Sequence, residues 1–188
     1  MKTTLTRELI VSEAYQVAEA ETIAKLSLRG MARRLEVQPQ RLYHFFPSLD
    51  DLKLAVAMHG RDILMHQLYE KLVPVSGRDA LYVFADTVFD FAKTHPSFQE
   101  MLTLAYKGHH VDAEIEETSA NIGSILMAIL TPMIDDETKR KQFAQAYLSL
   151  LFGYAKLSLY GFFGEGDLQG NLDDMIAFLA VALPEQKN

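Results

Sequence analysis

A cluster of polar side chains between residues 38 and 44 has the chemistry needed to recognise DNA. An arginine guanidinium matches O6 and N7 of guanine, a glutamine amide matches N6 and N7 of adenine, and a tyrosine hydroxyl suits a phosphate oxygen. All three types occur here within seven residues, together with a histidine: Gln38, Gln40, Arg41, Tyr43 and His44. We call these five the reading face, and expect both glutamines, the arginine and the histidine to address bases.

Two short helices must position the reading face. Leu28, Met31, Ala32 and Leu35 recur at the spacing of one helical face, and Ser27 precedes them as a predicted N-cap, so a helix should begin near residue 28. A second helix is predicted from Pro39, which is favoured at the first helical position, to about residue 45. The turn between them is too short to be a linker, which is typical of a helix-turn-helix.

The charge distribution agrees with this interpretation. The chain has a net charge of −7, but residues 1–60 carry 8 Lys and Arg against 7 Asp and Glu. Within residues 25–45 there is one acidic residue, Glu36, against a basic patch of Lys25, Arg29, Arg33, Arg34 and Arg41. Such a patch favours phosphate binding. The alternative is an ordinary solvated helical face.

Residues 6–56 resemble the DNA-binding domain of TetR-family transcriptional regulators. The similarity is carried by Ser27-Leu28-Arg29-Gly30-Met31-Ala32, by Val37, and by Leu42-Tyr43-His44-Phe45-Phe46-Pro47-Ser48. The resemblance implies a bacterial, cytoplasmic regulator that binds a double-stranded DNA operator. Arg29 and Tyr43 are then the expected phosphate contacts beside the base contacts of the reading face.

Two residues depart from the family pattern. Glu36 stands where the family usually has glycine, so a left-handed backbone there would cost about 1–2 kcal/mol, unless the turn takes another path. Leu49 replaces a lysine that contacts phosphate in the family. Lys53, one helical turn onward, is the expected substitute.

The rest of the chain predicts helices and no strand, because no segment alternates with a period of two residues. We therefore expect an all-α fold of about nine helices. The helix boundaries predicted from caps and breakers are a start near Thr4, a capping box of Ser48 and Asp51, a short helix over about Ser97–Lys107, a start near Asp112, and a last helix capped by Asn171. A three-helix helix-turn-helix head (residues 1–47) is followed by a larger helical bundle for ligand binding and dimerisation (residues 48–188). The apolar segment from Tyr147 to Phe163 is interrupted by Lys156 and is shorter than the roughly 20 residues that span a bilayer, so we expect no membrane association.

Helices near residues 147–163 and 172–183 predict a homodimer. Both are apolar over more than one face, and a stripe of small residues in the first permits close helix approach. We call the predicted interface the dimer face: Ala146, Ser149, Leu150, Gly153, Leu157, Met175, Phe178 and Leu179. The alternative is that both helices complete the core of one chain. A two-fold pair of heads would address a near-palindromic operator with half-sites about 34 Å apart.

The bundle is also the expected site of an unknown small-molecule effector, as the family resemblance implies. Candidate cavity-lining residues are apolar or aromatic: Phe84, Phe91, Met101, Tyr106, Met127, Phe152 and Phe162. The alternative for each is an ordinary place in the core. The region around Tyr147 and Phe152 is faintly similar to a family subgroup with a Trp-His-Gly signature, although neither the tryptophan nor the histidine is present.

Other functions find little support in the sequence. The chain has no cysteine, and His59, Asp62 and His66 have only a loose spacing for metal ligands, so no metal or other cofactor is expected. No catalytic triad spacing or phosphate-binding glycine loop occurs, which argues against an enzyme. We therefore predict a ligand-responsive homodimeric repressor. The rival is a TetR-like dimeric module that binds ligand or protein and has weakened DNA binding.

Overall fold

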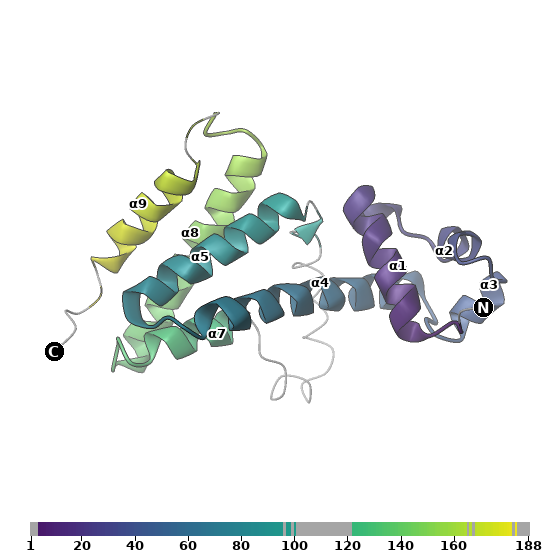
Figure 1. Ribbon diagram of the computed structural model, residues 1–188, viewed down its shortest axis with the longest axis horizontal. Helices are drawn as coiled ribbons and strands as arrows, with labels where there is room; N and C mark the ends of the chain where they lie inside the picture. Colours follow the sequence, from purple (N-terminus) through teal and green to yellow (C-terminus); the bar gives the residue numbers. More distant parts are fainter. Residues whose placement is uncertain are drawn as a thin grey trace. The chain divides into compact units, whose positions relative to one another are not determined.

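The computed structural model describes residues 4–95, 97–98, 100, 122–164, 166, 168–181 and 183. These residues form eight α-helices and one 3-10 helix, and no strand occurs among them (Figure 1). The predicted all-α class is therefore confirmed. The helix expected over Ser97–Lys107 and the first half of the one expected from Asp112 lie largely outside the described residues.

The chain divides into two compact units. The N-terminal unit joins Met1–Ile63 to His95–Thr118, and the C-terminal unit joins Leu64–Thr94 to Ser119–Asn188. Helix α4 (Leu49–Leu72) contributes its first part to one unit and its second part to the other. The boundary that we expect at residues 47 and 48 stays a prediction.

The head consists of α1 (Arg7–Ala20), the 3-10 helix η1 (Ile23–Lys25), α2 (Leu28–Arg34) and α3 (Pro39–Tyr43). Its core is a single apolar cluster to which α4 adds Leu52, Val56 and Ala57. Helix α1 begins three residues later than the expected Thr4, because Thr6 is the N-cap and its hydroxyl accepts a hydrogen bond from the amide of Leu9 at 3.2 Å.

The start of α4 is fixed by a capping box. The Ser48 hydroxyl accepts from the amide of Asp51 at 3.1 Å, and the Asp51 carboxylate accepts from the amide of Ser48 at 2.9 Å. The two donors that a helix start leaves free are thus satisfied reciprocally, as the sequence predicts.

Ring contacts around Tyr15 connect α1 to α4 in the N-terminal unit. The ring of Tyr15 makes an edge contact with His59, with ring centres 5.2 Å apart, and lies 6.4 Å from the ring of His95. One turn along α1, burial raises the pKa of Glu19 to about 7. The buried Ser97 hydroxyl donates to the carbonyl of Ala18 at 2.6 Å, which ties the segment after residue 94 to the end of α1.

The C-terminal unit packs α5 (Gly77–Thr94) against α7 (Ile122–Leu130), α8 (Glu137–Leu159) and α9 (Leu168–Ala180). Tyr147 is fully buried in α8, and its hydroxyl donates to the carbonyl of Leu81 in α5. Burial raises the pKa of Tyr147, so the phenol stays neutral and able to donate.

Helix α8 ends at Leu159, four residues before the predicted Phe163. The reason is a C-terminal cap in which Gly161 has a left-handed φ of 70°, the amide of Phe162 donates to the carbonyl of Leu157, and the amide of Gly161 donates to that of Ser158. This Schellman motif satisfies the last carbonyls and turns the chain away from the helix axis.

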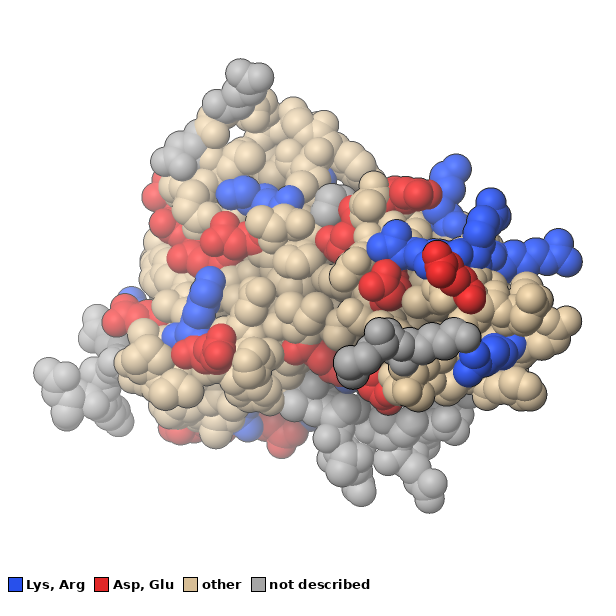
Figure 2. Space-filling model, turned by 45° about the vertical axis from the view of Figure 1, so that its right-hand side comes forward, with Lys and Arg blue, Asp and Glu red and all other residues tan. Residues whose placement is uncertain are grey.

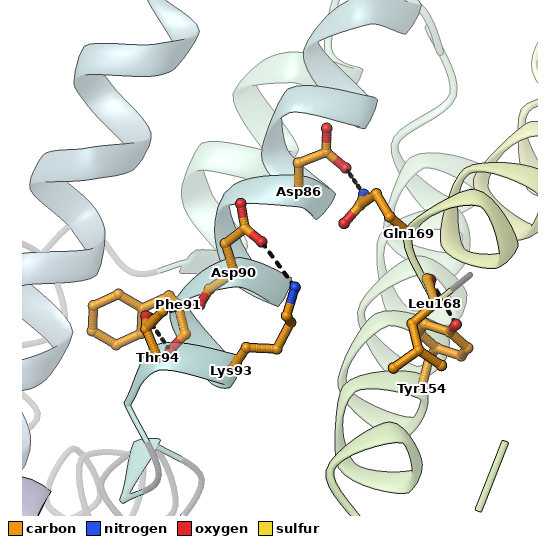
Figure 3. Close-up of polar contacts among 8 residues, drawn as sticks. All are labelled: Asp86, Asp90, Phe91, Lys93, Thr94, Tyr154, Leu168 and Gln169. Atoms are coloured by element: carbon orange, nitrogen blue, oxygen red, sulfur yellow. Dashed lines mark hydrogen bonds and ion pairs between the residues drawn. The ribbon is translucent and has the colours of Figure 1, made fainter. Parts of the chain in front are cut away.

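Helix α9 begins at Leu168, so the predicted cap at Asn171 is wrong and Asn171 lies inside the helix. Contacts with other helices override the local signal at this end (Figure 3). The Tyr154 hydroxyl donates to the carbonyl of Leu168 at 2.7 Å, and the Gln169 amide donates to the Asp86 carboxylate on α5.

None of the helices in the described ranges has both the length and the apolar composition required to traverse a lipid bilayer.

The raised pKa of Glu19 predicts a pH-dependent stability. Its ordinary value is 4.5, so the folded N-terminal unit holds the proton more tightly than the unfolded chain. This contribution to stability is present below about pH 4.5 and is lost as the pH rises through about 7. We expect Glu19→Gln to reduce the fall in thermal midpoint between pH 5 and pH 8, measured by circular dichroism. Glu21→Gln, at an exposed position, should leave that fall unchanged; an equal reduction in both variants would contradict the assignment.

Candidate nucleic-acid interface

The reading face is solvent-exposed along its whole length. Helix α3 has five residues, and its anchor is Leu42, which is fully buried, as is Phe46 just beyond the helix. All five predicted residues are exposed, with Tyr43 50% exposed: Gln38, Gln40, Arg41, Tyr43 and His44. The helix ends at Tyr43, two residues before the predicted Phe45. Leu42 and Phe46 are buried as the apolar pattern predicts, whereas Phe45, expected on the same face, is half-buried.

Helix α2 supports α3 from one side. Ser27 is its N-cap, with the hydroxyl accepting from the amide of Gly30 at 3.0 Å. A Cβ atom at position 30 would lie 2.8 Å from that hydroxyl oxygen, so a larger residue there would displace the Ser27 hydroxyl from its capping position. Met31 and Ala32 are buried, while Arg29 and Arg33 are exposed.

The turn between the two helices is a Schellman motif with a glutamate in the glycine position. The amide of Val37 donates to the carbonyl of Ala32 at 3.0 Å, and the amide of Glu36 donates to that of Arg33 at 3.3 Å. Glu36 has a φ of 53°, the left-handed conformation that costs a residue with a Cβ about 1–2 kcal/mol. Of the two expectations for this turn, a left-handed residue at position 36 or another path, the structure shows the left-handed residue.

One arginine of the basic patch is already paired with an acidic residue of the head. Arg34 forms an ion pair with Glu13 of α1 at 2.8 Å and also donates to the side chain of Gln16 at 3.4 Å. These bonds direct its guanidinium toward α1. Exposed basic side chains gather at the right of Figure 2. Four residues of the patch are exposed and form no ion pair with an acidic side chain of the described ranges: Lys25, Arg29, Arg33 and Arg41.

The residues after α3 differ from the family pattern in a way that the structure explains. Leu49 is half-buried and packs against the core of the head, so an apolar side chain suits this position. Lys53 is half-buried on the next turn of α4. Its proposed contact with phosphate stays a prediction.

One residue that the sequence analysis did not single out contacts the end of α3. Arg7, the first residue of α1, donates from Nη1 to the carbonyl oxygen of Phe45 at 2.8 Å. Its guanidinium carbon lies 4.3 Å from the centre of the Phe46 ring. Phe45 is 38 residues away along the chain, so no local spacing signals the contact.

The predicted dimer face is open to solvent in the single chain. Leu157 and Phe178 are exposed, the latter by 78%, and Leu150, Met175 and Leu179 are half-buried. The small residues of the stripe are exposed as well: Ala146, Ser149 and Gly153. Dimerisation itself stays a prediction.

The described members of the predicted ligand set differ in burial, and their role as the lining of one cavity stays a prediction. Phe84 and Phe91 are fully buried, Met127 and Phe152 are half-buried, and Phe162 is 72% exposed. Met101 and Tyr106 lie outside the described residues. Phe162 was expected inside the bundle, but the cap that ends α8 places it on the turn that follows.

An apolar groove of about 440 Å³ lies elsewhere in the C-terminal unit. It is bordered by the end of α4, the start of α5 and one side of α7, and its lining contains no charged side chain: Tyr69, Leu72, Val73, Val75, Ser76, Gly77, Ala80, Ser124, Ile125, Ala128, Ile129 and Pro132.

Histidines and carboxylates do not form a metal site in the described ranges, where no three of them are grouped as ligands. His66 pairs with Glu70 at 3.3 Å, and Asp62 pairs with Arg61 at 2.7 Å.

Comparison with solved structures identifies the fold as TetR-like. A TetR regulator from Streptomyces coelicolor superimposes with a TM-score of 0.69 over 95% of this chain and 97% of that one, at 16% identity. A protein of unknown function from Rhodococcus sp. RHA1 reaches 0.80 over 96% of this chain and 97% of the other, at 18% identity. BioQ in complex with its double-stranded DNA operator reaches 0.61 over 93% and 99%, at 19% identity.

Two curated proteins are similar in sequence. The uncharacterized HTH-type transcriptional regulator YobS of Bacillus subtilis is 28% identical over 111 residues, which cover 59% of this chain and 57% of YobS. The uncharacterized HTH-type transcriptional regulator Rv0681 of Mycobacterium tuberculosis is 25% identical over 95% of this chain and 82% of its own length. The chain thus matches little more than half the length of the first relative. No protein-family model matches the chain.

The left-handed turn makes a testable prediction about the head. Glu36→Gly should raise the free energy of unfolding by about 1 kcal/mol, because glycine adopts a positive φ without the Cβ clash. Urea denaturation followed by circular dichroism measures the change. Glu36→Ala removes the carboxylate but retains the Cβ atom and should give no comparable gain. Equal stabilisation by both variants would assign the effect to charge rather than to the backbone.

Proposed function

We propose that this protein is a homodimeric, DNA-binding transcriptional regulator whose α3 reads base edges in the major groove. The observation that carries the proposal is the reading face on α3, a five-residue helix held by buried Leu42 that leaves Gln38, Gln40, Arg41 and His44 exposed. The fold and the names of the two sequence relatives point to the same class of protein.

The reading face and the basic patch would make different contributions to DNA binding. Arg41 would donate two hydrogen bonds to a guanine, and the glutamines would pair with adenines, which supplies sequence discrimination. Arg29, Tyr43 and Lys53 would bind phosphates, which supplies affinity and fixes the register on the duplex. Arg29 and Tyr43 are exposed, which phosphate binding requires.

A second copy of the chain would cover the dimer face. Support comes from Phe178, whose 78% exposure leaves a large apolar side chain in water. Helices α8 and α9 of two chains would then form a four-helix interface, and the two heads would read a near-palindromic operator with half-sites about 34 Å apart.

The C-terminal unit would bind a small-molecule effector that releases the repressor from DNA. The apolar groove has a volume of about 440 Å³, within the usual range for ligand sites, and its uncharged lining favours a neutral apolar effector. Linkage requires such an effector to bind the off-DNA state more tightly than the operator-bound state.

A second candidate function is a dimeric binding module with weakened DNA affinity. It is motivated by the strained backbone at Glu36 and by the half-buried Leu49 in place of a phosphate-binding lysine. The two functions differ in whether the chain selects a DNA sequence.

Selection of bound duplexes from a random pool tests the proposal. We expect enrichment of one near-palindromic sequence that binds two chains. In a gel shift with that duplex, Arg41→Ala should weaken binding by about 10- to 100-fold, since a bidentate base contact contributes about 1–3 kcal/mol. Arg78→Ala, which removes an exposed arginine of α5, serves as the control and should bind like the wild type.

Each negative result of these DNA-binding experiments would exclude a different part of the proposal. No enrichment of any sequence would exclude the regulator and leave the binding module. Enrichment of an asymmetric site bound by one chain would exclude the dimeric reader. Equal affinity of the Arg41→Ala variant would remove α3 as the base-reading element.

The effector part of the proposal can be examined with Nile red, a neutral apolar dye. Its fluorescence should rise on binding to the groove, and Ala128→Phe, which fills the groove, should abolish the rise. Ala24→Phe, at an exposed position in η1, is the matched control. Saturating dye should lower affinity for the selected duplex; unchanged affinity would show that the groove is not coupled to DNA release.

A further inference from the structure

Arg7 joins the first turn of α1 to the end of α3 through two different interactions. Its Nη1 donates a hydrogen bond of 2.8 Å to the carbonyl oxygen of Phe45, and its guanidinium lies over the ring of Phe46 at 4.3 Å. Phe46 is fully buried, so the ring forms a fixed support under the cation. The contact therefore fixes both a backbone atom and the side chain that follows it.

Helix α3 needs such outside support because of its length. Five residues are far fewer than the roughly 12–15 at which an isolated helix becomes marginally stable in water. Gln38, at its N-cap position, makes no capping bond with its side chain. At the other end, the amides of Phe45 and Phe46 both donate to the carbonyl of Leu42, and the carbonyl of Phe45, two residues beyond the helix, accepts the hydrogen bond from Arg7.

The contact requires an arginine rather than any cation. A guanidinium is planar, so it can stack on an aromatic ring and donate in its own plane at the same time. A lysine ammonium would retain the charge, but it lacks the flat face and the fixed donor geometry. Thr6 holds the first turn of α1, from which Arg7 extends, by accepting from the amide of Leu9.

We propose that Arg7 is a positioning residue for α3: its bond to the Phe45 carbonyl and its contact with the Phe46 ring set the orientation of the reading face, and thereby the discrimination between DNA sequences. The inference rests on the proposed function, because discrimination presupposes that α3 reads DNA. Base contacts tolerate displacements of only about 0.5 Å, whereas attraction to phosphate tolerates much larger ones. Loosening the end of α3 should therefore lower specific binding and leave non-specific binding intact.

The experiment compares Arg7→Lys with wild type on two duplexes, the selected sequence and a scrambled sequence of equal length. We expect affinity for the selected duplex to fall about tenfold, with affinity for the scrambled duplex unchanged within about twofold. The dependence of affinity on salt should keep its slope, since the number of phosphate contacts is the same. Thermal midpoints measured in parallel set a temperature at which all variants are folded.

Arg140→Lys is the matched control. Arg140 also donates from Nη1 to a backbone carbonyl, that of Ile134 at 2.9 Å, but it does so in the C-terminal unit. The same substitution there removes the same kind of bond and should leave the ratio of the two affinities at the wild-type value. Arg7→Gln, which also removes the charge, should lower the ratio at least as much as Arg7→Lys.

Three results would overturn the inference. A fall of equal size on both duplexes would mean general loss of the head, and a shallower salt slope would mean that Arg7 binds phosphate directly. An unchanged ratio in both Arg7 variants would mean that α3 keeps its orientation without the contact. All three results can be obtained only if the wild-type protein selects a DNA sequence. If the selection enriches no sequence, the proposed function fails, and that failure is seen before any Arg7 variant is compared.

Discussion

The organisation of the head follows from one constraint: a helix of five residues cannot hold its own position. Helix α3 is placed by what lies beneath and around it, namely the burial of Leu42 and Phe46, the packing of α2, and the contact from Arg7. Because the inner side of α3 is committed to the core, its outer side is left to polar residues. The same neighbours that stabilise the helix therefore determine which side chains reach solvent.

Features that depend on neighbours within about four residues were predictable from the sequence. The Ser27 cap, the Ser48–Asp51 capping box and the exposure of the reading face are of this kind, and each follows from a local pattern. The start of α9 was not predictable, since its first turn is held by Tyr154 and Asp86 from other helices. Arg7 was missed for the same reason, and the groove could not be found because its lining comes from two stretches of chain that are more than 40 residues apart, 69–80 and 124–132.

Counting charges along the sequence overstated the basic patch, because proximity in sequence does not reveal pairing. Arg34 lies among the basic residues of α2 but is bonded to Glu13 of α1, so it contributes to the cohesion of the head. The net charge of −7 misleads in the opposite direction, because it does not describe the charge of the residues around α3. What a DNA phosphate would meet depends on the side chains left unpaired at the surface.

The glutamate in the turn between α2 and α3 has a consequence beyond the geometry of the turn. Glu36 is exposed, between the helices that carry the basic patch, and its carboxylate would repel the backbone of any duplex regardless of sequence. In a chromosome, where competing sites outnumber an operator by about a million or more, such uniform repulsion shortens each stay at a wrong site. A residue that weakens every encounter alike would leave the ratio of right to wrong binding untouched, while each wrong encounter would end sooner.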